Sequence, residues 1–157
     1  MGIEIRDWDR ADLPQIQRSW LAFCRNAARS DMRLIPQPEQ AMTEWLTSRF
    51  KHPAAFGFVA EMDDAMAGFL IGRVDEWESV PPVIEPRKLG IIDALYVDEG
   101  FRRQGIGTHL IEHAIGLLRE RDVVAVETIY AAWNDASTET WRHAGFAPWM
   151  VHAYRLL

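Results

Sequence analysis

The feature that most constrains this chain is a strand-like run that leads, through arginines and glycines, into a helix-like run. Residues 90–97 are rich in β-branched and aromatic side chains, as strands are. The segment Arg102-Arg103-Gln104-Gly105-Ile106-Gly107 follows. Apolar residues then recur at the spacing of one helix face, at Ile106, Leu110, Ala114 and Leu117. This strand, loop and helix unit predicts a mixed α/β domain.

The glycines and arginines of this unit indicate an anion-binding turn. Gly105 and Gly107 let backbone amides approach a ligand closely, because no Cβ intervenes. The first helical turn leaves amides unpaired at the positive end of the dipole, and Arg102 and Arg103 add charge there. A Walker loop is excluded because no Gly-Lys-Ser/Thr follows, and Leu110 replaces the third glycine of a Rossmann fingerprint. We therefore predict a phosphate-bearing ligand, with an ordinary strand-to-helix turn as the open alternative.

The remaining pattern predicts strands and helices on both sides of this unit. Ile16, Trp20 and Phe23 are spaced to share one face of a first helix, which runs from Asp12 to about Arg29. The other expected elements are a strand at 3–5, a helix around 41–50, a hairpin of 54–60 with 67–72, a strand at 123–130, a helix at 136–144 and a last strand at 149–157. A proline-containing loop with Asp75, Glu76, Glu78 and Glu85 follows the hairpin.

Length, charge and cysteine content narrow the class of protein further. A chain of 157 residues predicts one domain, over residues 1–157. The formal net charge of −6 disfavours nucleic acid as a partner, and no apolar run is long enough for a membrane span. Cys24 is the only cysteine, and the N-terminus lacks the pattern of a secretory signal. These features favour a cytoplasmic protein.

Two motifs together resemble the GNAT superfamily of acetyl-CoA-dependent N-acetyltransferases. Residues 102–107 match its R/Q-x-x-G-x-G/A signature, after a strand that ends at Leu95-Tyr96-Val97. Asn134, Trp141 and Gly145-Phe146 are similar to its second motif. The resemblance implies a central mixed, mostly antiparallel sheet flanked by helices, with strands that splay apart at the CoA site.

The resemblance also implies a ligand and a set of binding residues. Acetyl-CoA would be a co-substrate, and no metal is expected. The pantetheine arm would pair with the backbone of 95–97, the pyrophosphate would lie on amides of 103–108, and Asn134 would contact the ligand from across the cleft. The expected cofactor-binding residues are Leu95, Tyr96, Val97, Arg102, Arg103, Gln104, Gly105, Ile106, Gly107, Thr108, Asn134 and Trp141.

The implied reaction is transfer of acetyl to a primary amine of a small molecule, by direct attack in a ternary complex. The alternatives are acetylation of a protein N-terminus or lysine, and a regulatory module that binds acyl-CoA without turnover. Acetyl transfer needs an acceptor for the proton of the amine. Asp93 is the candidate base, because it lies two residues before Leu95, where it resembles the acidic residue of some family members. A carboxylate that only hydrogen-bonds a neighbour is the equal alternative. A homodimer is left open.

The proton donor to the leaving thiolate is the main departure from the family. Trp141 stands where the family usually has a tyrosine, and an indole is a poor proton donor. Either the thiolate leaves unassisted, or Tyr130 or Tyr96 substitutes, while Trp141 packs on the pantetheine arm. The run His109-Leu110-Ile111-Glu112-His113 spells an inverted zincin pattern, but it lies on the helix that opens with the anion turn. We expect surface histidines there rather than zinc ligands.

Overall fold

The computed structural model describes residues 2–157 and is built on one five-stranded sheet. The strands are β1 (Glu4–Asp7), β2 (Ala55–Met62), β3 (Ala65–Trp77), β4 (Arg87–Val97) and β5 (Ala125–Thr128), in that spatial order. The first three pairings are antiparallel, whereas β4 and β5 are parallel. The predicted mixed, mostly antiparallel sheet is confirmed.

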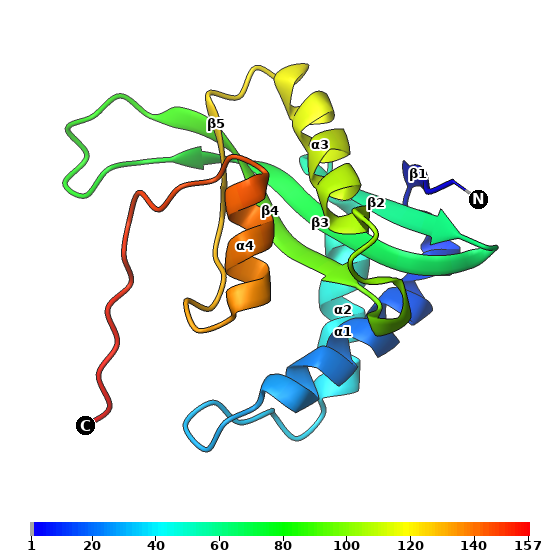
Figure 1. Ribbon diagram of the computed structural model, residues 1–157. Helices are drawn as coiled ribbons and strands as arrows, with labels where there is room; N and C mark the ends of the chain where they lie inside the picture. The colour runs from blue at the N-terminus through cyan, green and yellow to red at the C-terminus, as the bar shows by residue number, and fades with distance from the viewer. Residues whose placement is uncertain (1) are drawn as a thin grey trace.

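Helices cover both faces of the sheet (Figure 1). The helices are α1 (Leu13–Ala27), α2 (Pro38–Lys51), α3 (Ile106–Arg119) and α4 (Asp135–His143). Two short 3-10 turns, η1 (Arg10–Asp12) and η2 (Glu99–Phe101), precede α1 and α3. Asp9 caps η1, and Pro38 begins α2 where a proline costs no helical hydrogen bond. Within residues 2–157, no helix is both long and apolar enough to cross a membrane.

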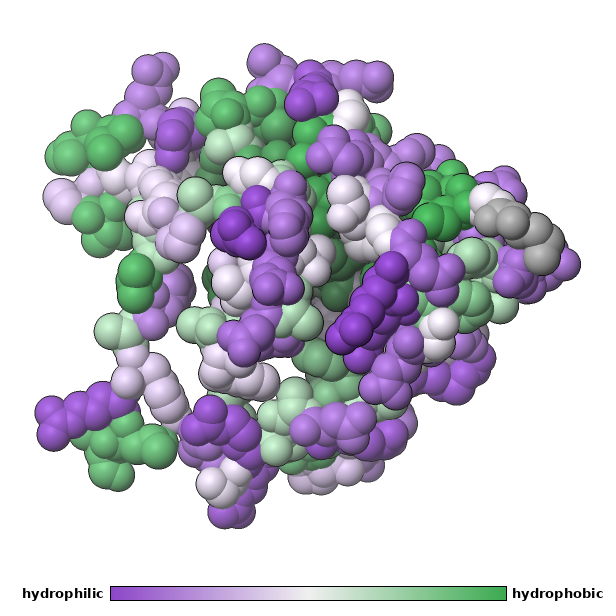
Figure 2. Space-filling view, viewed as in Figure 1, coloured by the Kyte–Doolittle hydropathy of each residue, from purple (hydrophilic) through white to green (hydrophobic). Residues whose placement is uncertain are grey.

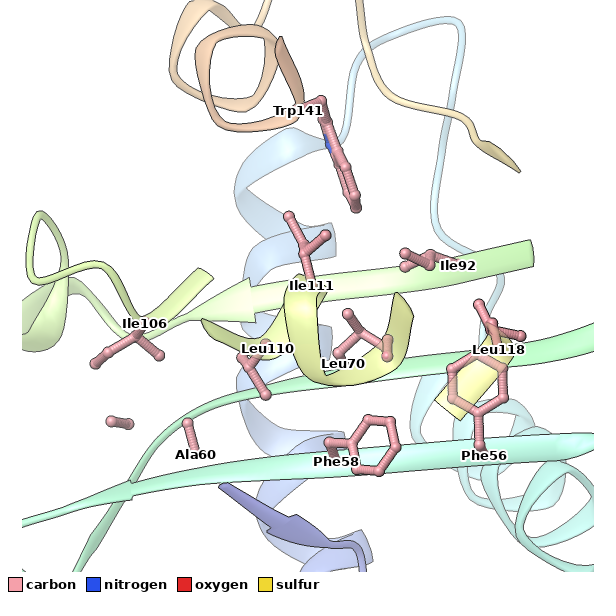
Figure 3. Packing of buried hydrophobic residues seen from close by; sticks show 12 residues of the cluster. Phe56, Phe58, Ala60, Leu70, Ile92, Ile106, Leu110, Ile111, Leu118 and Trp141 are labelled. Atoms are coloured by element: carbon pink, nitrogen blue, oxygen red, sulfur yellow. The ribbon is translucent and has the colours of Figure 1, made fainter. Parts of the chain in front are cut away.

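Each face of the sheet has its own hydrophobic core. On one face, α1 and α2 pack through Ile16 and Leu46 on Val59, Phe69 and Ile71. On the other face, α3 and α4 pack on side chains from β2, β3 and β4 (Figure 3). The buried residues of α3 are Ile106, Leu110, Ile111, Ala114 and Leu118. The helical spacing had predicted that Leu117 faces the core. Leu118 is the fully buried residue instead, and Leu117 is only partly buried.

The predicted face of α1 is correct at its start and wrong at its end. Ile16 is fully buried and Trp20 packs against the same core. Phe23 is 46% exposed, whereas Leu21 is buried. The reason is that α1 has no buried residue after Leu21, so its last turns do not reach the core.

Three strand predictions need correction. β3 continues to Trp77, so Asp75 and Glu76 belong to a strand rather than to the loop. β5 has only four residues of the expected 123–130. The expected last strand at 149–157 is wrong, because residues 147–157 form no strand within this chain and run away from the sheet (Figure 1). Residues such as Trp149, Val151 and Tyr154 favour a strand locally, but a strand also needs a neighbour to pair with.

Candidate functional site

The candidate site lies where β4 extends beyond the end of β5. The parallel pairing covers Leu89 to Ile92 of β4, whereas β4 itself continues to Val97. Thr128, the last residue of β5, donates from Oγ1 to the carbonyl oxygen of Ile92 at 3.1 Å. Beyond this point the outer backbone edge of β4 has no strand beside it in the described chain. The open strand edge therefore includes Leu95, Tyr96 and Val97. The resemblance to the family had implied strands that splay apart at this place.

A β-bulge in β4 lies just before the open edge. Ile71 pairs with Ala94 and Gly72 pairs with Ile92, so Asp93 is the extra residue of β4. A bulge bends its strand and increases the local twist. The bulge therefore turns β4 away from β5 at the residue that had been predicted as the catalytic base.

The turn that follows β4 exposes the amides at the start of α3. Gly105 caps α3 with φ of 80°, and Arg103 also has a positive φ of 63°. The amide of His109 bonds the carbonyl of Gly105 at 3.0 Å, which closes the first turn. The amides of residues 106–108 have no partner within the helix and lie at the positive end of its dipole. Only a glycine adopts the conformation at 105 without strain.

The two arginines of the turn differ in their contacts. Arg102 donates from Nε to the carbonyl oxygen of Val97 at 3.1 Å and lies 3.5 Å from Glu99. The exposed side chain of Arg103 makes no hydrogen bond or ion pair with residues 2–157. Arg103 is therefore the cation of this turn that can reach an anionic ligand, whereas Arg102 fixes the turn to the end of β4.

Helix α4 packs beside the first turn of α3. Asn134 caps α4 by accepting the amide of Ser137 at 3.1 Å, which leaves its side-chain NH₂ as a donor. Thr140 was not identified from the sequence, yet its Cγ2 would lie 3.6 Å from a Cβ at Gly107. Ile106 is 1% exposed and packs in the core beneath α3, so its side chain cannot contact a ligand.

Trp141 lies inside the core that α4 shares with α3. Its side chain is 3% exposed and points toward Ile111 (Figure 3). Its ring stacks on Tyr130 with centroids 6.4 Å apart and meets the edge of Phe146 at 5.0 Å. Most of the indole surface is therefore already in contact with protein, which limits what it can offer to a pantetheine arm.

Tyr96 packs on the opposite face of the sheet. Its ring stacks on Phe69 with centroids 5.3 Å apart, in the core that α1 and α2 cover. Burial, and then the nearby charge of Asp98, raise the pKa of the Tyr96 phenol above its usual value. The phenol is therefore protonated at neutral pH.

Two arginines hold the carboxylate of Asp93. Arg73 of β3 donates to Oδ1, and Nη2 of Arg49 on α2 lies 3.7 Å from Oδ2. Oδ2 is buried and accepts no hydrogen bond from the described residues. The guanidinium of Arg49 also lies over the ring of Trp45, 4.8 Å from its centroid. Asp93 therefore makes the contacts with neighbouring side chains that its alternative, purely structural role predicts. Its Oδ2 atom nevertheless accepts no hydrogen bond from the described residues.

Comparisons with known proteins agree with this geometry. The model of the acetyltransferase (GNAT) family matches residues 13–146. This chain belongs to the GNAT family. A GCN5-related N-acetyltransferase from Ralstonia eutropha JMP134 is 26% identical, with a TM-score of 0.77 over 99% of both chains. Aminoglycoside N-acetyltransferase AAC(6')-Iy, solved in complex with CoA, is 15% identical with a TM-score of 0.78 over 99% of this chain and 95% of that one.

A curated relative matches only part of the chain. The mycothiol acetyltransferase of Beutenbergia cavernae is 35% identical over 77 residues, which is 49% of this chain. The chain spans only 25% of the length of that relative. The predicted membership of the GNAT family and the GNAT fold are confirmed, whereas the roles of individual residues stay predictions.

The histidines of α3 lie on the outside of the GNAT fold. His109, Glu112 and His113 are exposed, and Nδ1 of His109 lies 2.8 Å from the carbonyl oxygen of Gly105. The ring of His113 packs against the edge of Phe58 at 4.5 Å. Among residues 2–157 there is no group of three or more His, Cys, Asp or Glu side chains that could hold a metal ion.

Proposed function

We propose that this GNAT protein is an N-acetyltransferase that transfers acetyl from acetyl-CoA to a primary amine of a small molecule. The observation that carries the proposal is the open edge of β4 at 95–97 beside the unpaired amides that begin α3. An extended amide-bearing arm can pair with a strand edge, and a diphosphate suits a helix N-terminus. The proposal treats residues 1–157 as one cytoplasmic domain and includes a homodimer.

The proposed binding roles are assigned to backbone and side-chain groups that have no hydrogen-bond partner within the protein. The backbone of 95–97 would pair with the pantetheine arm, and the amides of residues 103–108 would surround the pyrophosphate. The side chain of Arg103 and the NH₂ of Asn134 have no other partner in the contacts described above and would contact the ligand from two sides. Gln104 and Ile106 would contact the pyrophosphate through their backbone amides and not through their side chains.

The proposed chemistry is direct attack of the amine on the thioester carbonyl. The nitrogen forms a bond to the carbonyl carbon, the C–S bond breaks, and the proton of the amine passes to Oδ2 of Asp93, directly or through water. A backbone amide on the open edge of β4 would donate to the developing oxyanion. The thiol has a pKa of about 8.5, so the thiolate can leave without Tyr130 or another acid.

A small molecule is proposed as acceptor because of the names of two similar proteins. One relative is named for mycothiol and a solved neighbour for aminoglycosides. The test is an assay of thiol release from acetyl-CoA with a panel of amines. The panel contains aminoglycosides, amino sugars and polyamines, together with peptides that carry a free N-terminus or a lysine. Release with a small amine supports the proposal, and release with peptides alone contradicts the choice of acceptor.

Replacing Gly105 by alanine is expected to lower the affinity for acetyl-CoA at least tenfold, because a Cβ disfavours the left-handed backbone that aims the amides. Gly145→Ala is the matched control, since Gly145 also has a positive φ of 84° and open space around it. Both variants should lose about 1 kcal/mol of stability. Isothermal titration measures the affinity, and an equal affinity in the two variants would disprove a role for the turn.

Replacing Arg103 by alanine is expected to weaken acetyl-CoA binding about 10- to 100-fold and to leave binding of acetyl-pantetheine unchanged. The reason is that a charge-assisted contact to phosphate contributes roughly 1.5–3 kcal/mol, and acetyl-pantetheine lacks the pyrophosphate. Arg119→Ala, at the exposed far end of α3, is the control and should bind both ligands normally. A parallel loss for both ligands would place Arg103 outside the phosphate site.

A further inference from the structure

Arg49 of α2 is a largely buried arginine whose guanidinium makes no hydrogen bond. Hydrophilic residues are spread over the face of the molecule that Figure 2 shows, so an exposed charge by itself marks no site. The side chain of Arg49 is only 20% exposed, and it donates no hydrogen bond to residues 2–157. Within these residues, the only polar side-chain atoms that are buried without a partner are Nε of Arg87 and Oδ2 of Asp93. The nitrogen atoms of Arg49 therefore reach solvent, and their N–H donors are available to a ligand.

Aromatic packing limits the positions that this guanidinium can take. It lies over the ring of Trp45, 4.8 Å from the centroid. Trp45 and Trp20 meet edge to face with centroids 5.3 Å apart, and both pack against the core beneath α1 and α2. A guanidinium that is already ordered loses little conformational entropy when it binds an anion, and its planar fork matches a carboxylate. Arg49 therefore has the properties of an anion-binding residue.

Arg49 also lies beside the candidate base. Its Nη2 atom is 3.7 Å from Oδ2 of Asp93, which is longer than a hydrogen bond. Arg73 pairs with the other oxygen, Oδ1, and also with Asp75, so Asp93 already has one close cationic partner. Oδ2 is buried, so an acceptor can reach it only if a neighbouring side chain moves. No hydrogen bond holds Arg49 at Oδ2, whereas Arg73 is hydrogen-bonded to Oδ1.

We propose that the acceptor is an α-amino acid, and that Arg49 binds its carboxylate while its amine lies at Oδ2 of Asp93. This inference rests on the proposed acetyl transfer and names its class of acceptor; the products are an N-acetyl amino acid and CoA. The nitrogen and the carboxylate carbon of an α-amino acid are about 2.5 Å apart, which suits two protein groups separated by only 3.7 Å. An acceptor with widely separated charges would leave one group unpaired. The carboxylate draws Arg49 away from Oδ2, so that the base becomes accessible when such an acceptor binds.

Matched pairs of acceptors test the requirement for a carboxylate. Thiol release from acetyl-CoA is measured with the natural L-amino acids and with the corresponding amino acid amides, which keep the amine and the side chain but lack the negative charge. The best amino acid should exceed its amide by about 10- to 100-fold in kcat/KM, the range of a charge-assisted hydrogen bond. Amides that react as well as the amino acids would overturn the inference and leave the proposed acetyl transfer intact. Absence of release with every amine, aminoglycosides included, would overturn both.

Arg49→Gln tests the role of the residue itself. The variant should lower kcat/KM for the amino acid about 10- to 100-fold and leave that for the amide nearly unchanged, so that the preference disappears. Its affinity for acetyl-CoA should stay normal, which shows that it is folded. Lys51→Gln removes a positive charge from the exposed end of α2 and is the matched control, which should retain the preference. A preference that survives in Arg49→Gln, or an equal loss for both acceptors, would overturn the assignment of Arg49.

Discussion

Replacing Asp93 by asparagine is expected to lower kcat/KM for the amine by about 10²–10⁴, the usual contribution of a general base. Affinity for acetyl-CoA should not change, because Asp93 precedes the open edge of β4 rather than belonging to it. Steady-state kinetics and isothermal titration measure the two quantities. The amide is isosteric with the carboxylate but cannot accept the proton of the amine.

The matched control for Asp93→Asn is Asp75→Asn. Asp75 also pairs with Arg73, but its side chain is 55% exposed, whereas that of Asp93 is 16% exposed. Asp75→Asn should therefore leave kcat/KM unchanged. If Asp93→Asn lost about 1–3 kcal/mol of stability but kept its rate, Asp93 would only hold Arg73 and Arg49. A wild-type protein that binds acetyl-CoA without turnover of any amine would favour the regulatory module.

Replacing Trp141 by alanine is expected to lower the free energy of unfolding by about 3–5 kcal/mol, the usual cost of removing a buried indole. Its ring lies in the core between α3 and α4 and contacts Tyr130 and Phe146. Urea denaturation followed by circular dichroism measures the loss. Such a loss is a large share of the total stability of a domain of this size.

Trp133→Ala is the control for Trp141→Ala. Trp133 is 65% exposed, so its loss should change the free energy of unfolding by no more than about 0.5 kcal/mol. A Trp141→Phe variant retains most of the apolar volume and should be stable enough for binding measurements. If Trp141→Phe kept its stability but lost affinity for acetyl-CoA, Trp141 would be a wall of the pantetheine site rather than a core residue.

Local patterns predicted most of the fold and of the ligand turn. The turn at 102–107 could be predicted because its glycines, arginines and helix start are contiguous. Asp93 was named as a candidate base from its position on the strand, but the β-bulge that it forms was not predicted. The two motifs around 90–146 gave the expected family and the splayed strands. Ile106, Leu110 and Ala114 of the α3 core face followed from helical spacing, because that spacing is a property of the segment itself.

Features that depend on distant contacts could not be predicted. Arg73 and Arg49 meet Asp93 only because β3 and α2 pack beside β4. Thr140 lies beside Gly107, at the start of α3, only because α4 packs against α3. The segment 147–157 contains residues that favour strands, such as Trp149, Val151 and Tyr154, but whether it forms one depends on an available sheet edge, and that is a property of the assembled fold.

The most direct test of the central claim is a calorimetric titration of the wild-type protein with acetyl-CoA, with acetyl-pantetheine titrated in parallel. The account predicts binding of one acetyl-CoA per chain, and weaker binding of acetyl-pantetheine, because the amides that begin α3 hold the pyrophosphate. Absence of binding, or equal affinity for the two ligands, would contradict the assignment of residues 95–108 as the acetyl-CoA site.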